Sequence, residues 1–171
     1  MTKNIVQNEI ATGLRDALRS LVRPVAVITA EHNGQNFAMA ATAFCEVSMD
    51  PPSMLVCVNR SNATFSVIAE GADIGLNFLA DSHEELSKRC GGGATQNAKF
   101  DVGDWLLEEG KPPRLVDSCA TMVLCPTQIV DHGTHAVVIG EITDVSSSSN
   151  RAPLSFHNGG YIFPLAKSAF N

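Results

Sequence analysis

The sequence has little charge, and it gathers none of that charge into a block. Only 18% of the 171 residues are charged, and the formal net charge is −6 at pH 7. Because the lysines and arginines are scattered singly, we expect neither a nucleic-acid-binding surface nor attraction to an anionic membrane. A surface with so few charges also permits an interface with a second copy of the chain.

Long apolar runs are missing as well. No stretch approaches the ~18 apolar residues of a membrane-spanning helix. The opening residues, MTKNIVQNEIATGL, lack the apolar centre of a signal peptide. These absences predict a cytoplasmic protein with no membrane partner.

Cysteines are present, but their number and spacing do not indicate disulfide bonds or a metal site. The five cysteines are odd in number and have no CxxC spacing, which disfavours a disulfide scaffold and a zinc site. The histidines of HGTH (132–135) are three residues apart, so on a strand they face opposite ways. No third ligand is evident, and we therefore predict no metal.

The motifs of the common nucleotide-binding and hydrolase folds are absent too. No GxGxxG or GxxxxGK[ST] follows a predicted strand, and there is no GxSxG nucleophile elbow. A Cys–His nucleophilic pair stays open in principle, although no local pattern singles one out.

What the chain does contain is a series of short strand patterns joined by turns and loops. Strands are predicted over 25–30, 37–44, 54–58, 73–80, 120–133, 134–146 and 159–165, with a turn at 32–36 and a solvated loop at 146–150. No regular alternation of strand and helix is present. The pattern indicates a mainly β domain, an antiparallel barrel or sandwich with a few covering helices.

Helical patterns are fewer. One apolar stripe ends before Pro24 and consists of Ile10, Leu14, Leu18 and Leu21. A short helix fits 64–71, and a capping box of Ser82 and Glu85 begins another helix that Gly91 ends. Residues 91–105 are expected to be irregular.

The most informative stretch is SMDPPSMLVCVNRSNATF (48–65). Its apolar strand ends in a cluster of small polar residues, Asn59, Ser61, Asn62 and Thr64. Hydroxyl groups and free N–H groups at the start of a helix favour an anion. The simpler interpretation, in which Asn62 is only a helix N-cap, explains one polar residue of the four.

Two further groupings could carry chemistry. In AATAFCEVS (40–48), small side chains lead into Ser48, and they would let a flat ring or a phosphate approach the backbone. In AKF (98–100), a single lysine stands beside a phenylalanine at the end of the predicted irregular stretch. Such a lysine is ordinarily solvated.

Together these segments resemble the flavin reductase-like family, the small NAD(P)H:flavin oxidoreductases that serve two-component flavin monooxygenases. AATAFCEVSMDPP resembles the family's TANSF segment, serine and DPP, and AKF resembles its basic-aromatic pair before a tryptophan, here Trp105. GTHAVVIGEI resembles its GDH segment, and PLSFHNGGY resembles its closing tyrosine segment. Together with LRDALRSLVRPVAVITA near the beginning of the chain, these make five segments in the right order, and the resemblance is therefore specific.

The resemblance implies an FMN-binding split β-barrel of Greek-key topology, spanning 1–171 with its core at about 14–165. It also implies a homodimer with flavin, FMN or FAD, near the subunit interface. The residues expected to bind flavin or nicotinamide are Ala41, Thr42, Ala43, Ser48, Cys57, Asn59, Ser61, Thr64, Phe65, Lys99, Phe100, His135 and Tyr161.

Within that set the resemblance implies distinct roles. Asn59, Ser61 and Thr64 would contact the ribityl and phosphate oxygens, and Lys99 would be the phosphate cation. His135 would act as the catalytic contact on the nicotinamide side, and Tyr161 would either cover the nicotinamide or pack in the barrel. Asp50-Pro51-Pro52 is expected to hold the chain extended as it enters the strand.

The implied function is a reductase that transfers hydride from NADH or NADPH to flavin and supplies reduced flavin to a separate monooxygenase. No arginine cluster for a 2′-phosphate is evident, which favours NADH. The family's TANSF is AATAF here, so two polar contacts are alanines, which favours exchangeable flavin. The alternatives are a non-catalytic flavin-binding or sensory module, an interaction domain without flavin, and an enzyme like pyridoxamine-phosphate oxidase, which uses a similar barrel.

Overall fold

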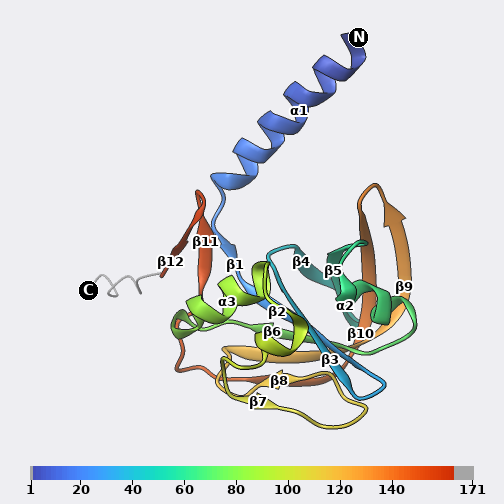
Figure 1. Ribbon diagram of the computed structural model, residues 1–171, viewed down its shortest axis with the longest axis vertical. Coiled ribbons are helices and arrows are strands. Elements are labelled where there is room, and N and C mark those ends of the chain that lie inside the picture. Colours follow the sequence, from blue (N-terminus) through green and yellow to red (C-terminus); the bar gives the residue numbers. More distant parts are fainter. Residues whose placement is uncertain (1, 164–171) are drawn as a thin grey trace.

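An antiparallel sheet of seven strands forms the body of the molecule (Figure 1). The computed structural model describes residues 2–163, and of residues 2–5 it describes the backbone only. The strand order is β3-β2-β6-β9-β10-β5-β4, and the strands are β2 Ala26–His32, β3 Gln35–Ala41, β4 Phe44–Met49, β5 Pro52–Asn59, β6 Ile74–Phe78, β9 Ala120–His132 and β10 His135–Ser147. The expected mainly β, split-barrel class is confirmed.

Among the described residues, two smaller sheets and four α-helices surround this body. One small sheet joins β1 Arg23–Pro24, β11 Ser155–His157 and β12 Gly160–Ile162, and the other joins β7 Trp105–Leu106 and β8 Arg114–Leu115. The helices are α1 Thr2–Arg19, α2 Ala63–Ala69, α3 Glu84–Gly91 and α4 Gln96–Lys99, with a 3-10 turn at Asp81–His83 before α3. Of the predicted strand at 159–165, residues 164 and 165 lie outside the described part.

The barrel is split because its two edge strands, β3 and β4, are consecutive in the chain but do not pair with each other. Only Thr42 and Ala43 connect them. The sequence predicted one strand over 37–44, whereas the chain turns at these two residues and β4 pairs with β5 instead. The break places small side chains at the end of the seam between the two edges.

The core has two parts that share strand β2. One cluster fills the barrel and includes Ile28, Val56, Ile74 and Leu124. The other packs under α3 and contains Val27, Leu79, Leu86 and Leu154. Because successive side chains of a strand point to opposite faces, the apolar run of β2 serves both clusters at once. The strand is thus buried on both sides.

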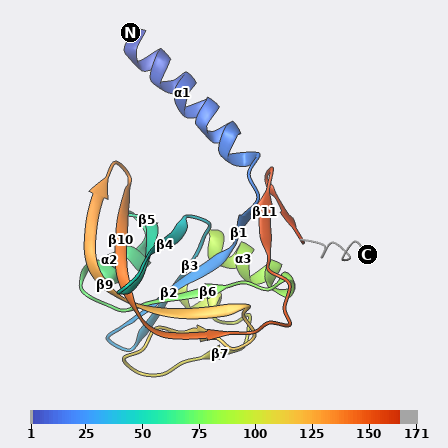
Figure 2. The same ribbon diagram turned by 180° about the vertical axis from the view of Figure 1, so that it is seen from behind.

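Helix α1 extends away from this body, and both views show it projecting beyond the barrel (Figures 1 and 2). Its predicted apolar residues Ile10, Leu14 and Leu18 are exposed along it. Among the described residues, no helix is both long enough and apolar enough to cross a membrane.

Two local predictions are wrong, and each has a physical reason. Ser82 does not cap α3; the Ala80 amide instead donates to the His83 Nδ1 atom over 3.1 Å at the start of the 3-10 turn. Asp50 and Pro51 form the turn between β4 and β5 rather than an extended entry, and their peptide bond is cis. Pro52 is the first residue of β5, a position that needs no ladder donor.

The stretch predicted to be irregular contains α4, and this helix covers the free edge of β3. Gln96 accepts a hydrogen bond from the Ala38 amide over 2.9 Å, and the Lys99 ammonium donates to the Ala38 carbonyl over 2.7 Å. Lys99 is only 6% exposed, and burial lowers its pKa. The lysine thus satisfies a sheet edge instead of being solvated, as such a lysine ordinarily is, and its expected contact with a phosphate stays a prediction.

We predict that Lys99→Met lowers the free energy of unfolding by about 1–3 kcal/mol, because the buried Ala38 carbonyl loses its donor. Urea unfolding measures this change. Lys111→Met is the matched control, since Lys111 is an exposed lysine whose partner is Glu108, and its effect should stay within about 0.5 kcal/mol. Unchanged stability of Lys99→Met together with weaker flavin binding would support the phosphate role expected from the sequence.

Candidate functional site

A cavity of about 400 Å³ lies where α3, the small β1–β11–β12 sheet and the end of β3 meet. This volume falls within the range of small-molecule sites. The lining residues are Arg23, Val25, Ala40, Ala41, Thr42, Ser87, Lys88, Gly91, Phe156 and Tyr161. The cavity therefore contains three of the residues expected from the sequence, Ala41, Thr42 and Tyr161.

Tyr161 is held in place by three contacts. Its hydroxyl donates to the Ser87 Oγ atom over 2.9 Å, and its ring packs edge-on against Phe156 with centroids 5.2 Å apart. The Lys88 ammonium lies 5.8 Å from the centre of the same ring. The ring is thus a fixed wall of the cavity that joins β12 to α3, and it presents an aromatic surface to a ligand.

The small residues at the seam connect this cavity to the polar end of β5. The Cys57 amide donates to the Ala43 carbonyl over 2.9 Å, which ties the Thr42–Ala43 connection to β5. Two residues further along, Asn59 accepts from both the Ser61 amide and the Ser61 hydroxyl, at 2.9 and 2.8 Å. The expected ring-binding and phosphate-binding segments are therefore neighbours in the fold.

His135 lies beside this polar end. It is the first residue of β10 and pairs in register with Asn59 on one side and His132 on the other. Its side chain is exposed, and its Nδ1 atom lies 2.9 Å from the Thr134 hydroxyl. Its Nε2 atom has no hydrogen-bond partner among the described residues, so this atom can contact a ligand.

At the start of α2, Asn62 acts as a helix N-cap, whereas Thr64 offers a polar group that the cap does not explain. Asn62 is the N-cap, because its side chain accepts from the Thr64 amide over 2.9 Å. Thr64 is fully buried, and its hydroxyl has no hydrogen-bond partner in the described part of the chain. The interpretation of Asn62 as a helix N-cap is therefore confirmed, but it does not account for the buried Thr64 hydroxyl.

Four expected residues have contacts of their own within the fold. Ser48 is at the far end of β4, roughly 16 Å along the strand from Ala43, and its hydroxyl bonds to the Asp50 backbone. Lys99 bonds to β3 as described above, and Phe100 packs against Trp105 in the second core cluster. Phe65 packs partly against the barrel core.

Cys57 occupies a half-buried position near the exposed Cys45 of β4. Burial raises the pKa of the Cys57 thiol, and the nearby Cys45 raises it further. A thiol with a raised pKa is a poor nucleophile at neutral pH. This position therefore offers a neutral surface rather than a reactive group.

Sequence reasoning missed Arg23, Ser87, Lys88 and Phe156. Arg23 stands alone before Pro24, and Lys88 looks like an ordinary partner of Glu84 four residues earlier on a helix. Neither spacing distinguishes them from solvated surface residues. Only the docking of α3 against the small sheet brings them to one cavity.

No cluster of three or more metal-ligating side chains is found within the described residues. The arrangement instead has aromatic and small walls with a few polar groups, which suits a flat organic ligand bearing an anionic part.

Comparison with known proteins identifies the class. Residues 18–162 match the family described as flavin reductase like domain, so the chain belongs to the flavin reductase-like family, as the sequence motifs predicted. The curated FMN reductase (NADH) RutF of Agrobacterium fabrum is 31% identical over 147 residues, covering 86% of this chain and 84% of that protein.

Two solved structures share the fold. The NADH:FAD oxidoreductase SgcE6 of Streptomyces globisporus, in complex with NAD and FAD fragments, has a TM-score of 0.83 at 22% identity, covering 94% of this chain and 95% of that one. BorF, the flavin reductase component of a bacterial two-component tryptophan halogenase, has a TM-score of 0.83 at 23% identity, covering 92% of this chain and 99% of that one.

Proposed function

We propose that this protein is an NADH-dependent flavin reductase that supplies reduced flavin to a separate flavin-dependent monooxygenase. The observation that carries the proposal is the cavity beside the barrel seam, with Ala41, Thr42 and Tyr161 in its lining and the polar end of β5 next to it. The family of the chain and the name of its curated relative support the same activity.

The residues of the site fit a flavin. Bound flavin would accept a hydride from reduced nicotinamide, and the chain would supply binding and alignment. The small side chains of Ala41, Thr42 and Ala43 leave the backbone open to a flat ring. Asn59 and Ser61 offer polar atoms for ribityl or phosphate oxygens, and the unpartnered Thr64 hydroxyl lies at the same corner.

Two rings must be stacked at reactive distance for hydride transfer, and this step needs no protein acid or base. Holding both substrates in one geometry can lower the barrier by several kcal/mol. Tyr161 and Phe156 pack edge-on against each other and form an aromatic wall on one side of the cavity. His135, which pairs in register with Asn59 at the polar end of β5, is proposed to orient the nicotinamide-side substrate.

NADH and FMN are the proposed substrates because the curated relative is named an FMN reductase (NADH). The structure of SgcE6, an NADH:FAD oxidoreductase, keeps FAD as an alternative flavin. Flavin is proposed to exchange freely, since the seam carries alanines where the family has polar contacts. The name of BorF, a component of a two-component system, supports delivery of the product to a second enzyme.

We predict flavin-dependent oxidation of NADH by the purified protein, with FMN, FAD and riboflavin tested in turn. Flavin should be lost during gel filtration in flavin-free buffer, because few polar contacts hold it. A protein that stays yellow at one flavin per chain and does not reduce added flavin would instead be a self-contained flavoenzyme or a sensor. A colourless protein that leaves flavin fluorescence unchanged would contradict any flavin function.

We predict that His135→Ala reduces NADH turnover or raises the KM for NADH by about tenfold through lost alignment, while flavin affinity stays near that of the wild type. The control is His132→Ala, which removes the exposed histidine paired with His135 across the hairpin. Steady-state kinetics with varied NADH give the comparison. Equal constants for His135→Ala and wild type would remove His135 from the site.

A homodimer is also proposed, with α1 covering a second copy. Helices in proteins gain most of their stability from packing of an apolar face, yet the stripe of Ile10, Leu14 and Leu18 is exposed on the described chain. We predict that Ile10→Asp combined with Leu14→Asp shifts the protein from dimer to monomer in light scattering after gel filtration. Asp16→Ser, elsewhere on the same helix, should leave the mass unchanged, and a monomeric wild type would contradict the proposal.

A further inference from the structure

We propose that Arg23, Ser87 and Lys88 form a phosphate-binding subsite in the cavity under Tyr161. The proposal rests on the proposed function, because it assigns a part of the substrate to a part of the same site. The chemistry that would be recognised is a phosphate ester or diphosphate on a nucleotide. Either the flavin phosphate or the diphosphate of the dinucleotide could supply it.

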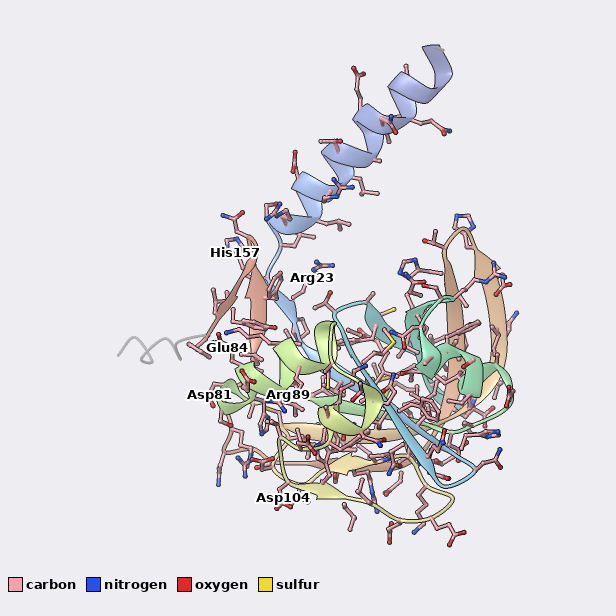
Figure 3. The ribbon with its side chains drawn as sticks, in the orientation of Figure 1. Arg23, Asp81, Glu84, Arg89, Asp104 and His157 are labelled. Atoms are coloured by element: carbon pink, nitrogen blue, oxygen red, sulfur yellow. The ribbon has the colours of Figure 1, made fainter. Side chains whose placement is uncertain are left out.

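Charge is the first observation. The protein carries a net charge of −6, yet the charged side chains that line this cavity, among the described residues, are the two cations Arg23 and Lys88. Figure 3 shows Arg23 reaching out from β1 above the end of α3, away from the acidic residues Asp81 and Asp104. A cavity lined by one sign of charge concentrates ligands of the opposite sign.

An unsatisfied donor is the second observation. The Nε atom of Arg23 is buried and has no hydrogen-bond partner in the described part of the chain. A buried donor without a partner carries a desolvation cost that a bound acceptor would remove. Guanidinium groups match phosphate geometry, because they present several N–H groups in one plane.

Ser87 provides a neutral donor beside these charges. It is 2% exposed, and its Oγ atom accepts the Tyr161 hydroxyl proton. In this arrangement the Ser87 proton remains free to donate to an oxygen in the cavity. Tyr161 thereby orients the Ser87 hydroxyl, which links the aromatic wall to the anion-binding groups.

Lys88 is placed to alternate between two partners. Its ammonium is paired with Glu84 and is 55% exposed, and the hydrogen bond to Glu84 together with the charge of Glu84 raises its pKa. The lysine therefore stays protonated while the site is empty. An exposed ion pair of this kind is weak, so a phosphate that enters the cavity can compete for the same ammonium.

The experiment measures direct binding without turnover, by quenching of flavin fluorescence, for FMN and for riboflavin. Lys88→Met should weaken FMN binding about three- to tenfold, and Arg23→Met about tenfold or more, with riboflavin unchanged. Glu84→Gln should strengthen FMN binding, because it frees Lys88. Lys111→Met, which removes a similar exposed and glutamate-paired lysine elsewhere, should change neither.

Kinetics identify the source of the phosphate. If the two cation variants leave FMN and riboflavin binding unchanged, the KM for NADH should rise while that for dihydronicotinamide riboside does not. That result assigns the subsite to the dinucleotide. Inorganic pyrophosphate should compete with the affected substrate in the wild type, and added salt should reduce the difference between wild type and variants.

The proposal is overturned if phosphate-bearing and phosphate-free ligands respond alike, or if neither responds to the cation variants. Should Arg23→Met fail to fold, Arg23→Lys and the exposed Lys88→Met still decide the matter, with thermal unfolding as the check. A wild type that binds FMN more tightly than riboflavin but oxidises no NADH would contradict the proposed activity and leave the phosphate subsite standing. A wild type that oxidises NADH, with cation variants that bind and react as it does, would contradict the subsite and leave the activity standing.

Discussion

The unpaired seam between β3 and β4 is the constraint on which the rest of the structure depends. These strands follow each other in the chain, but the two-residue connection at Thr42 and Ala43 sends them to opposite edges of the sheet. Each edge then exposes backbone donors and acceptors that must be satisfied or covered. Helix α4 covers β3 at Ala38 through Gln96 and Lys99. The end of the seam remains open, and the small residues there form one side of the ligand cavity.

Strand β2 connects the barrel to the part of the site that is formed by α3. Because both of its faces are buried, it fixes the barrel core and the cluster under α3 in one frame. Helix α3 presents Ser87 and Lys88 only as long as Leu86 and Cys90 remain in that second cluster. Burial raises the pKa of Cys90 to about 11, as expected for a thiol that acts as a core residue. One short helix thus carries both residues that line the cavity and residues that pack in the core.

The sequence predicted what depends on local pattern and missed what depends on packing. The hairpins of β2–β3 and β9–β10 follow from apolar runs separated by turn residues, and the α2 cap follows from Asn62. The role of Lys99 could not be predicted, because a lysine beside a phenylalanine is usually solvated and only the edge of β3 gives it a buried acceptor. Arg23 and Lys88 are separated by 65 positions in the chain, and no spacing rule joins residues that meet through the docking of a helix on a small sheet.

The same geometry accounts for how a site can hold two anionic nucleotides and still release them. The polar end of β5 offers hydroxyl and amide groups, and its basic side chain, Arg60, is paired with Asp131. The cavity under Tyr161, by contrast, is lined by two cations. Uniformly tight binding of substrates would not accelerate hydride transfer, since only interactions stronger in the transition state do so. If the proposed subsite is correct, the pairing of Lys88 with Glu84 and the alanines of the seam limit how tightly either nucleotide is held. The rigid elements, Tyr161 against Phe156 and Ser87, then provide alignment without requiring high affinity, which is what an enzyme that passes its product to another protein needs.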